Sequence, residues 1–300
     1  MKPVTLKEIA AKLNISVSTV SKALKDYPDI GVETKNQVRE LAKSLNYKPN
    51  TLAINLRTNE SNDLERKQIQ LLLNQRVDGM IISLANDTEQ CDHINQVLDQ
   101  KTPLVMFDKV SKRVECSKIV INDRKAAYEA TRHLIEKGCR RIAHFRGALT
   151  PLNSIDRFMG YRNALLDHGL EYDPSLVYIC QCDDRSFEEG KENAKKLLED
   201  HQDIDGIFIN TDLVAIGALT EFRNQGVRVP KDIRVVGFSN WFMSSVISPS
   251  LTTIDQPGFQ MGETAFDQLF IEIETLKKGK DPVFKTIELE TELIERESTG

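Results

Sequence analysis

Residues 5–24, TLKEIAAKLNISVSTVSKAL, restrict the possible fold more than any other stretch of this chain. Thr5 and Glu8 have the spacing of a capping box, which predicts a helix beginning at Leu6. Apolar residues then recur at helical spacing along one face. The pattern breaks at a two-residue turn before Ser16, which can cap a second helix. Two short helices joined in this way form a helix-turn-helix.

The second predicted helix turns Val20, Ala23 and Leu24 inward, and its outer face is small and rich in hydroxyl groups. Such a face can lie close against the major groove of double-stranded DNA. We expect base-edge contacts from Val17, Ser18 and Lys22. Hydroxyl groups and helix N-terminal amides predict phosphate contacts from Thr5, Ser16, Thr19 and Ser21. The alternative is a helix-turn-helix that contacts only protein.

The charge of the chain is unevenly distributed. Residues 1–60 hold ten Lys/Arg and six Asp/Glu, a net charge of +4, whereas the other residues hold 30 and 39, a net charge of −9. Phosphate attraction is therefore confined to the N-terminal head. This asymmetry favours nucleic-acid binding by the head alone.

A third helix, from about Val32 to Leu45, completes a small bundle, with Val38, Leu41, Ala42 and Leu45 facing inward. Asn50 can then cap a helix of only about two turns, which is too short to be stable in water without a partner. Within it, Leu56 beside the small Ala53 suits a wedge in the minor groove, and Tyr47 and Asn50 can add backbone contacts. The alternative is a linker helix docked on the body.

This head resembles the lactose-repressor/galactose-repressor (LacI-type) family of bacterial transcription regulators. The matching runs are residues 5–10, 17–21, 33–34, 47–50 and the spacing of 53–56. A helix-turn-helix followed at once by Tyr-x-Pro-Asn and a hinge helix is a specific combination.

The rest of the chain alternates apolar strand-like runs with amphipathic stretches, which predicts parallel sheets covered on both faces. Strands are expected at 77–83, 104–108, 119–121, 141–145, 177–180, 206–210 and 233–238. Helices are expected at 64–74 and near 89–100, 125–137, 155–168, 186–200, 212–225 and 258–278. The predicted fold class is thus an all-α head on an α/β body, divided into a head at 1–47, a hinge and linker at 48–60, and a body at 61–300.

The resemblance continues in the body, at residues 157–161, 210–218, 226–230, 235–240 and 249–257. It implies a two-lobed, periplasmic-binding-protein-like fold for effector binding and dimerisation. The N-terminal lobe would comprise about 64–122 and 257–281, and the C-terminal lobe about 123–256 and 282–300. Crossovers between the lobes are expected near 122–124, 253–257 and 280–284.

The same resemblance implies an effector site in the cleft between the lobes. The matching positions are Asp108, Asn153, Arg157, Asp212, Asn240 and Gln256, and Trp241 or Phe158 could stack on a ligand. Carboxylates, amides and a guanidinium suit the hydroxyl groups of a sugar. Two alternatives remain open: a structural ion pair between Arg157 and Asp212 across the lobes, and a core or interface position for Trp241.

One departure from the family concerns the start of the body. The family carries about 45 more residues between the hinge helix and Leu64, which would supply the first strand, the first helix and the second strand of the N-terminal lobe. Because that first strand is central, its absence should leave the 77–83 strand at a sheet edge. The absent helix belongs to the family's dimer face, so the departure bears on dimerisation as well as on effector response.

Other function classes lack the required motifs. A Gly-rich phosphate loop, Gly-x-Ser-x-Gly and His-Glu-x-x-His are all missing, so no catalytic residue, metal site or cofactor is assigned. The cysteines have no metal-ligand spacing and are expected to be reduced: Cys91, Cys116, Cys139, Cys180 and Cys182. The sequence has neither a signal peptide nor an apolar run near 18 residues, so a cytoplasmic protein with no membrane contact is expected.

These observations predict a sugar-responsive transcription regulator, expected to be a repressor, that binds a near-palindromic operator as a homodimer. Lobe closure around the effector would order or melt the paired hinge helices. One alternative is a family member that binds DNA but no longer responds to an effector. A sugar-binding transport receptor would need a signal peptide, and a sugar kinase with a regulatory helix-turn-helix would need a phosphate loop.

Overall fold

The computed structural model describes residues 6–13, 15–16, 19–20, 23, 31–44, 61–181 and 185–300. The chain divides into two compact units, residues 1–57 and 58–300. Within the described ranges, no helix is long and apolar enough to cross a membrane. Four of the five cysteines lie in these ranges, and all four are buried and free, as predicted: Cys91, Cys116, Cys139 and Cys180. Cys182 lies outside them.

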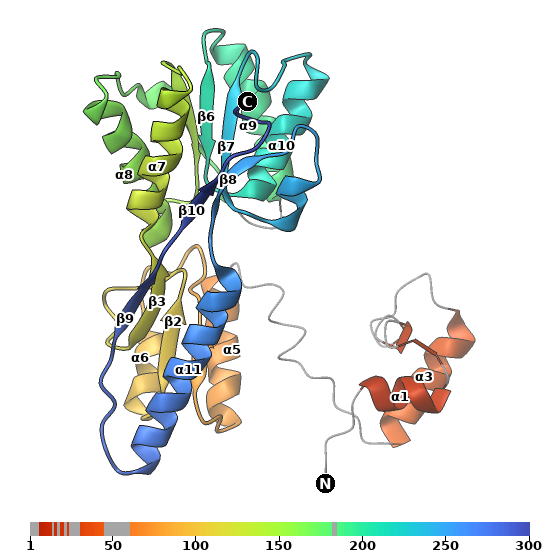
Figure 1. Cartoon of the computed structure of the whole chain (residues 1–300). Coiled ribbons are helices and arrows are strands. Elements are labelled where there is room, and N and C mark those ends of the chain that lie inside the picture. The colour runs from red at the N-terminus through yellow and green to blue at the C-terminus, as the bar shows by residue number, and fades with distance from the viewer. Residues whose placement is uncertain are drawn as a thin grey trace. The chain divides into compact units, whose positions relative to one another are not determined.

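The first unit contains α1 (Leu6–Leu13) and α3 (Val32–Ser44), with helical backbone also at 19–20 and 23 (Figure 1). Among the described residues of this unit, the buried core side chains are small and apolar: Ala10, Val20, Ala23, Val38 and Ala42. The predicted helix start at Leu6 is confirmed, as are the inward positions of Val20, Ala23, Val38 and Ala42. The predicted inward residues Leu24 and Leu45 lie outside the described residues.

The C-terminal lobe of the second unit is built on a six-stranded sheet with the order β10-β8-β7-β6-β4-β5. Its strands are β4 (Ile142–Arg146), β5 (Val177–Ile179), β6 (Gly206–Ile209), β7 (Arg234–Ser239), β8 (Thr252–Asp255) and β10 (Glu292–Ile294). Its helices are α7 (Asp123–Glu136), α8 (Leu152–Asp167), α9 (Ser186–Asp200) and α10 (Asp212–Asn224), with short 3-10 turns η1 (Pro174–Leu176) and η2 (Phe242–Ser245). All strand pairs are parallel except β8 with β10.

The apolar runs of this sheet are buried on both faces, as expected for a parallel sheet between helix layers. In β6, Phe208 packs with α7 and α8, whereas Ile207 and Ile209 pack with α9 and α10. The two helix pairs flank the sheet in Figure 1. Gly160 allows α8 to approach α7 closely, because a Cβ atom there would lie 2.3 Å from the carbonyl oxygen of Arg124.

The N-terminal lobe has a four-stranded parallel sheet with the order β1-β2-β3-β9. The strands are β1 (Met80–Ile82), β2 (Leu104–Phe107), β3 (Ser117–Ile121) and β9 (Thr286–Leu289). Helices α5 (Asn62–Asn74) and α6 (Asp92–Asp99) pack on one face, and α11 (Gly258–Lys277) packs on the other. Strand β1 lies at the sheet edge, which confirms the expectation for the 77–83 run.

Three segments connect the lobes, as Figure 1 shows. The first lies at residue 122, between β3 and α7, and the second at 256–257, between β8 and α11, both close to the predicted positions. The third lies at 290–291, between β9 and β10, so its predicted position at 280–284 was wrong. Residues 278–285 instead turn the chain back within the N-terminal lobe, so that β9 can pair with β3. The N-terminal lobe therefore extends to Leu289.

Candidate functional site

In the head, Ser16 caps the second helix of the predicted helix-turn-helix. Its Oγ accepts a hydrogen bond from the Thr19 backbone N–H at 3.0 Å and lies 2.8 Å from Thr19 Oγ1. The Val20 N–H donates to the Ser16 carbonyl at 3.1 Å. Ser16 is exposed and Thr19 is half-buried, so the cap that positions this helix is also accessible to a phosphate.

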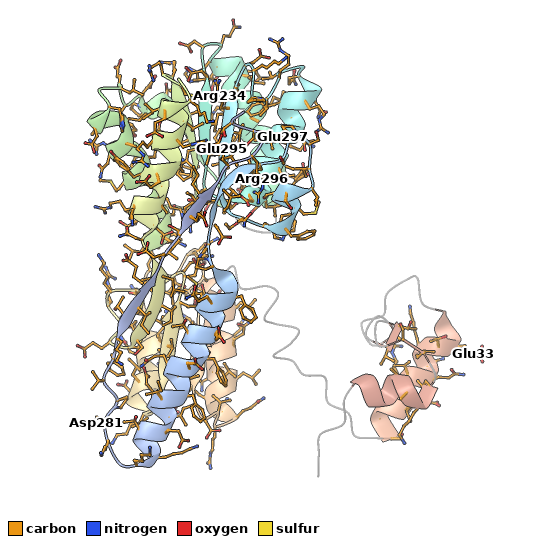
Figure 2. All side chains as sticks on the ribbon, viewed as in Figure 1. Glu33, Arg234, Asp281, Glu295, Arg296 and Glu297 are labelled. Atoms are coloured by element: carbon orange, nitrogen blue, oxygen red, sulfur yellow. The ribbon has the colours of Figure 1, made fainter. Side chains whose placement is uncertain are left out.

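Lys12, Arg39 and Lys43 add exposed cationic side chains to the same unit. Glu33, labelled in Figure 2, is exposed in the first turn of α3, where a carboxylate favours the helix dipole. The remaining predicted DNA contacts lie outside the described residues: Thr5, Val17, Ser18, Ser21, Lys22, Tyr47, Asn50, Ala53 and Leu56.

In the body, three of the predicted effector residues meet where the lobes face each other. Asp108 follows β2 of the N-terminal lobe, with a positive φ of 55°. Its Oδ1 accepts hydrogen bonds from Gln256 Nε2 at 2.9 Å and from Asn153 Nδ2 at 3.4 Å. Gln256 lies in the second crossover and Asn153 in the first turn of α8. The cluster thus joins both lobes and a connecting segment through one carboxylate.

Two cavities lie between the lobes. One has a volume of about 470 Å³ and is lined by Asp108 and Asn153. The other, of about 580 Å³, is lined by residues after β1 and β2, by residues 149–152 and by Ile155, and none of the predicted effector residues lines it. Of the two, only the smaller cavity is lined by predicted effector residues, Asp108 and Asn153, whose side chains are hydrogen-bonded to each other.

Arg157 is almost fully buried, with 4% of its surface exposed, and its partners lie in its own lobe. Its Nε donates to Asp123 Oδ1 at 2.7 Å, and its Nη1 donates to the carbonyl oxygen of Asn210 at 2.9 Å. The guanidinium carbon lies 3.6 Å from the centre of the Phe238 ring. Burial raises the pKa of Asp123 against the opposing effect of Arg157. The alternative of an ion pair between Arg157 and Asp212 across the lobes was therefore wrong.

Asp212 is fully buried and organises the loop after β7. Its Oδ2 accepts hydrogen bonds from the Trp241 N–H at 2.8 Å and Ser244 Oγ at 2.7 Å, and its Oδ1 accepts one from Thr253 Oγ1 at 2.7 Å. Burial raises the pKa of Asp212, while these hydrogen bonds lower it. Both carboxylate oxygens of Asp212 are therefore already used to hold the Trp241 loop and Thr253.

Asn240 is held on both sides of its amide. Its Nδ2 donates to Asp255 Oδ1 at 2.7 Å, and its Oδ1 accepts from Arg296 Nη2 at 2.7 Å. Figure 2 labels Arg296 in the segment after β10. Trp241 is 43% exposed and lies edge-on to Phe242, so it is not a core residue. Its indole ring is thus partly exposed to solvent.

Sequence reasoning missed two features of the cleft. Asn86, after β1, donates from Nδ2 to the carbonyl oxygen of Gln181 in the other lobe at 2.9 Å. The loop that carries Asn86 is held by Glu65, whose carboxylate accepts from the Ala85 N–H at 2.6 Å and from Thr88 Oγ1 at 3.0 Å. The position of Asn86, three residues after the end of the predicted 77–83 strand, was a usable signal. Glu65 carried no such signal in the sequence, because an acidic residue in the first turn of a helix is normally solvated.

Comparison with known proteins identifies both units. Residues 5–50 match the family described as "Bacterial regulatory proteins, lacI family". Residues 41–292 match "Periplasmic binding proteins and sugar binding domain of LacI family". The transcriptional regulator RegA of Clostridium saccharobutylicum is 28% identical over 337 aligned positions, which cover 98% of this chain and 99% of RegA. That alignment is longer than the 300 residues of this chain, so RegA contains residues with no counterpart here.

Two solved structures share the fold. The CelR transcriptional regulator in complex with cellobiose is 26% identical, with a TM-score of 0.72, and the match covers 98% of this chain and 99% of CelR. A LacI family regulator of Enterococcus faecium with bound ribose is 25% identical, with a TM-score of 0.68, over 78% of this chain and 82% of that one. Because the two family matches together extend from residue 5 to residue 292, the chain belongs to the lacI family of bacterial regulatory proteins.

Proposed function

We propose that this regulator is a repressor that binds a near-palindromic operator as a homodimer and is controlled by a sugar or sugar derivative. Binding to DNA would place its site of action in the cytoplasm, and the protein would act by binding rather than by catalysis. The observation that carries the proposal is the combination, in one chain, of a capped helix-turn-helix with a cleft in which one carboxylate joins two lobes.

The chemistry of the cleft suits an uncharged, hydroxyl-rich ligand. Asp108 accepts hydrogen bonds from the side-chain amides of Asn153 and Gln256. A sugar hydroxyl could take the place of either amide as the donor to Asp108, and the hydroxyl oxygen could then accept a hydrogen bond from the displaced amide. Trp241 offers an apolar face for the carbon skeleton. Cellobiose and ribose are the ligands named for two structures with this fold.

Regulation would follow from closure of the lobes. One cluster of buried apolar side chains includes residues of α11 and β3 in the N-terminal lobe and of α7 and α8 in the C-terminal lobe. A change in the angle between the lobes would therefore be transmitted through packed side chains. A coupling of about 1–3 kcal/mol would change operator affinity by about five- to 150-fold.

The test of DNA binding is selection of bound sequences from a random duplex library, followed by gel-shift titration of the enriched site at low salt. We expect a sequence with two related half-sites and a complex of two chains per duplex, measured by light scattering. Failure to enrich any sequence, with a preparation shown to be dimeric, would rule out the repressor.

A second candidate function is a regulator that binds its operator without responding to an effector. It is favoured by the edge position of β1 and by the residues that RegA contains in excess. A thermal-shift screen of sugars and sugar acids separates the two candidates. A ligand that raises the melting temperature and changes the gel-shift midpoint supports the regulated repressor, whereas enrichment of an operator with no responsive ligand supports the second candidate.

A further inference from the structure

A cavity of about 370 Å³ lies in the N-terminal lobe at the end of the sheet opposite to the cleft. It is lined by Leu104, the first residue of β2, whereas Asp108, directly after the same strand, lines the cleft. Asp281, labelled in Figure 2 at the turn after α11, marks its rim. The cavity is therefore separate from the proposed effector site, and the proposed function does not use it.

Glu272 of α11 lines this cavity and is only 1% exposed. Its Oε1 accepts hydrogen bonds from Ser117 Oγ at 2.5 Å and Gln268 Nε2 at 2.9 Å. Its Oε2 is buried and has no hydrogen-bond partner in the part of the chain that the structure describes. A buried carboxylate oxygen without a donor is costly, by about 1–3 kcal/mol or more. Because Glu272 lines the cavity, a ligand bound there is the candidate donor for Oε2.

The other side chains around the cavity determine which kind of donor fits. Glu115 and Asp281 add two further carboxylates, against one cation, Lys101. Lys118, on β3, does not line this cavity, and its Nζ donates to the carbonyl oxygens of Val114 at 2.7 Å and Cys116 at 3.1 Å. The charge of the cavity is thus negative, and a cationic donor is favoured over a neutral one.

More than half of the residues that line the cavity are apolar. Leu276 and the half-exposed Phe284 line it, together with two leucines and two prolines. The volume lies within the range of about 300–1,000 Å³ that is usual for pockets that bind small molecules. The ligand should therefore combine a cationic head with a short hydrocarbon body.

We propose that this cavity is a second ligand site, specific for a small organic cation. An ammonium or guanidinium group would donate to Glu272 Oε2, and the alkyl chain would pack against Leu276 and Phe284. Glu115 and Asp281 would contribute long-range attraction at the rim. The site would work independently of sugar binding in the cleft.

The experiment is calorimetric titration of the full chain at constant ionic strength with butylammonium chloride, with agmatine, and with neutral 1-butanol. We expect saturable binding of one cation per chain with a Kd of about 1 mM or tighter, and no saturable binding of 1-butanol. A guanidinium preference would appear as tighter binding of agmatine. Absence of saturable binding of both cations up to about 10 mM would overturn the proposal.

Variants locate the site. Glu272→Gln removes the charge with little change in shape, and we expect it to weaken cation binding at least about tenfold. Glu274→Gln is the matched control on the same helix, because Glu274 pairs with Lys277 on the surface, and it should bind as the unmodified chain does. If Glu272→Gln lowers the melting temperature, Phe284→Ala provides the second test, since it should weaken butylammonium binding while the chain stays folded. Binding that is unchanged in both variants would contradict the assignment.

Discussion

At the scale of single residues, burial decides what each polar side chain can do. Arg157, Asp212 and Asn240 come from motifs that the family resemblance assigns to the effector, yet each already has two or more partners within its own lobe. Asp108 differs, because its partners come from the other lobe and from a crossover. The first three residues are held within their own lobe, and Asp108 is the group that we propose a ligand recruits.

Replacement of Arg157 by lysine should destabilise the body. A lysine ammonium cannot hydrogen-bond both Asp123 and the Asn210 carbonyl while it stacks on Phe238. The buried carboxylate of Asp123 would therefore lose much of the positive charge and hydrogen bonding that stabilise it. We expect a loss of about 3 kcal/mol in the free energy of unfolding, measured by urea denaturation. Arg124→Lys is the control, because Arg124 pairs with Asp156 at the surface and should lose less than about 1 kcal/mol. Equal losses would show that the buried pair contributes no more than the exposed one.

His144 should make the body less stable in mild acid. It is fully buried between Tyr161 and Phe208, and burial lowers its pKa from 6.5 to about 3. Between these values the unfolded chain binds a proton that the folded chain does not, so stability is present above pH 6.5 and is lost as the pH falls towards 3. The contribution of this residue should fall by roughly 2 kcal/mol between pH 7 and pH 5.

The measurement for His144 is urea unfolding of the natural chain and of His144→Gln at both pH values. Glutamine can still donate a hydrogen bond to the Phe208 carbonyl, as the imidazole Nδ1 does at 2.9 Å, but it does not titrate. The variant should be less stable at pH 7 and should lose less stability on acidification. His133, whose pKa burial also lowers, remains in both proteins and cancels in the comparison. An identical pH dependence would mean that His144 is not the responsible group.

At the scale of elements, the cap of a helix affects its stability, and the unpaired edge of a strand affects its association with other chains. The second helix of the head depends on one hydroxyl cap, that of Ser16. Among the described strands, β1 pairs with β2 alone, and it presents Ile81 with 37% of its surface exposed. The first feature concerns the stability of the DNA-reading helix, and the second concerns association between chains.

Ser16→Ala should destabilise the head by about 1 kcal/mol, since it removes the acceptor for the Thr19 N–H. The melting temperature of the head, followed separately from that of the body by calorimetry, is the measurement. Ser44→Ala is the control in the same unit, because the Ser44 hydroxyl only donates to the Leu41 carbonyl near the end of α3. A similar effect of both substitutions would argue against a special role for the cap.

Ile81→Lys should reduce concentration-dependent self-association. A lysine on an exposed edge strand discourages pairing with a strand of another chain, and the side chain can reach solvent at little cost in stability. Leu213→Lys is the matched control, because Leu213 has the same exposed fraction of 37% but lies on α10, where no strand edge is open. Dynamic light scattering over a concentration series compares the three proteins. If Ile81→Lys leaves self-association unchanged, the exposed edge of β1 is not the cause of that self-association.

At the scale of the whole molecule, two lobes are joined by three connections and by a few polar contacts across the cleft. Asp108 receives hydrogen bonds from Asn153 and Gln256, and Asn86 donates to the Gln181 carbonyl. Hydrogen bonds to a charged group contribute about 1.5–3 kcal/mol each. These few contacts are therefore enough to bias the balance between open and closed lobes.

Asp108→Ala should shift the lobes towards open states by at least about tenfold, since it removes the acceptor shared by Asn153 and Gln256. Small-angle X-ray scattering should show a larger radius of gyration than for the natural chain. Asp99→Ala, at the exposed end of α6 in the same lobe, is the control and should not change it. The idea fails if both variants scatter like the natural chain.

The sequence alone determined the local elements with strong periodicity or end signals. Capping residues and apolar spacing placed α1, and continuous apolar runs placed β2, β4, β6 and β7, because these signals act within a few residues of the chain. The family resemblance supplied the two-lobed body and the positions of the first two crossovers. It also led to the expectation that β1 would be an edge strand.

Only the tertiary structure decided the rest. Strands β9 and β10 are short and mostly polar or exposed, so their pairing with β3 and β8 leaves no periodic signal, and the third crossover was misplaced for that reason. The partner of Arg157 depends on which carboxylate is brought within 2.7 Å, a contact between residues 34 positions apart. Local propensity cannot encode such contacts, because burial and hydrogen bonding between distant segments exist only once the lobes have packed.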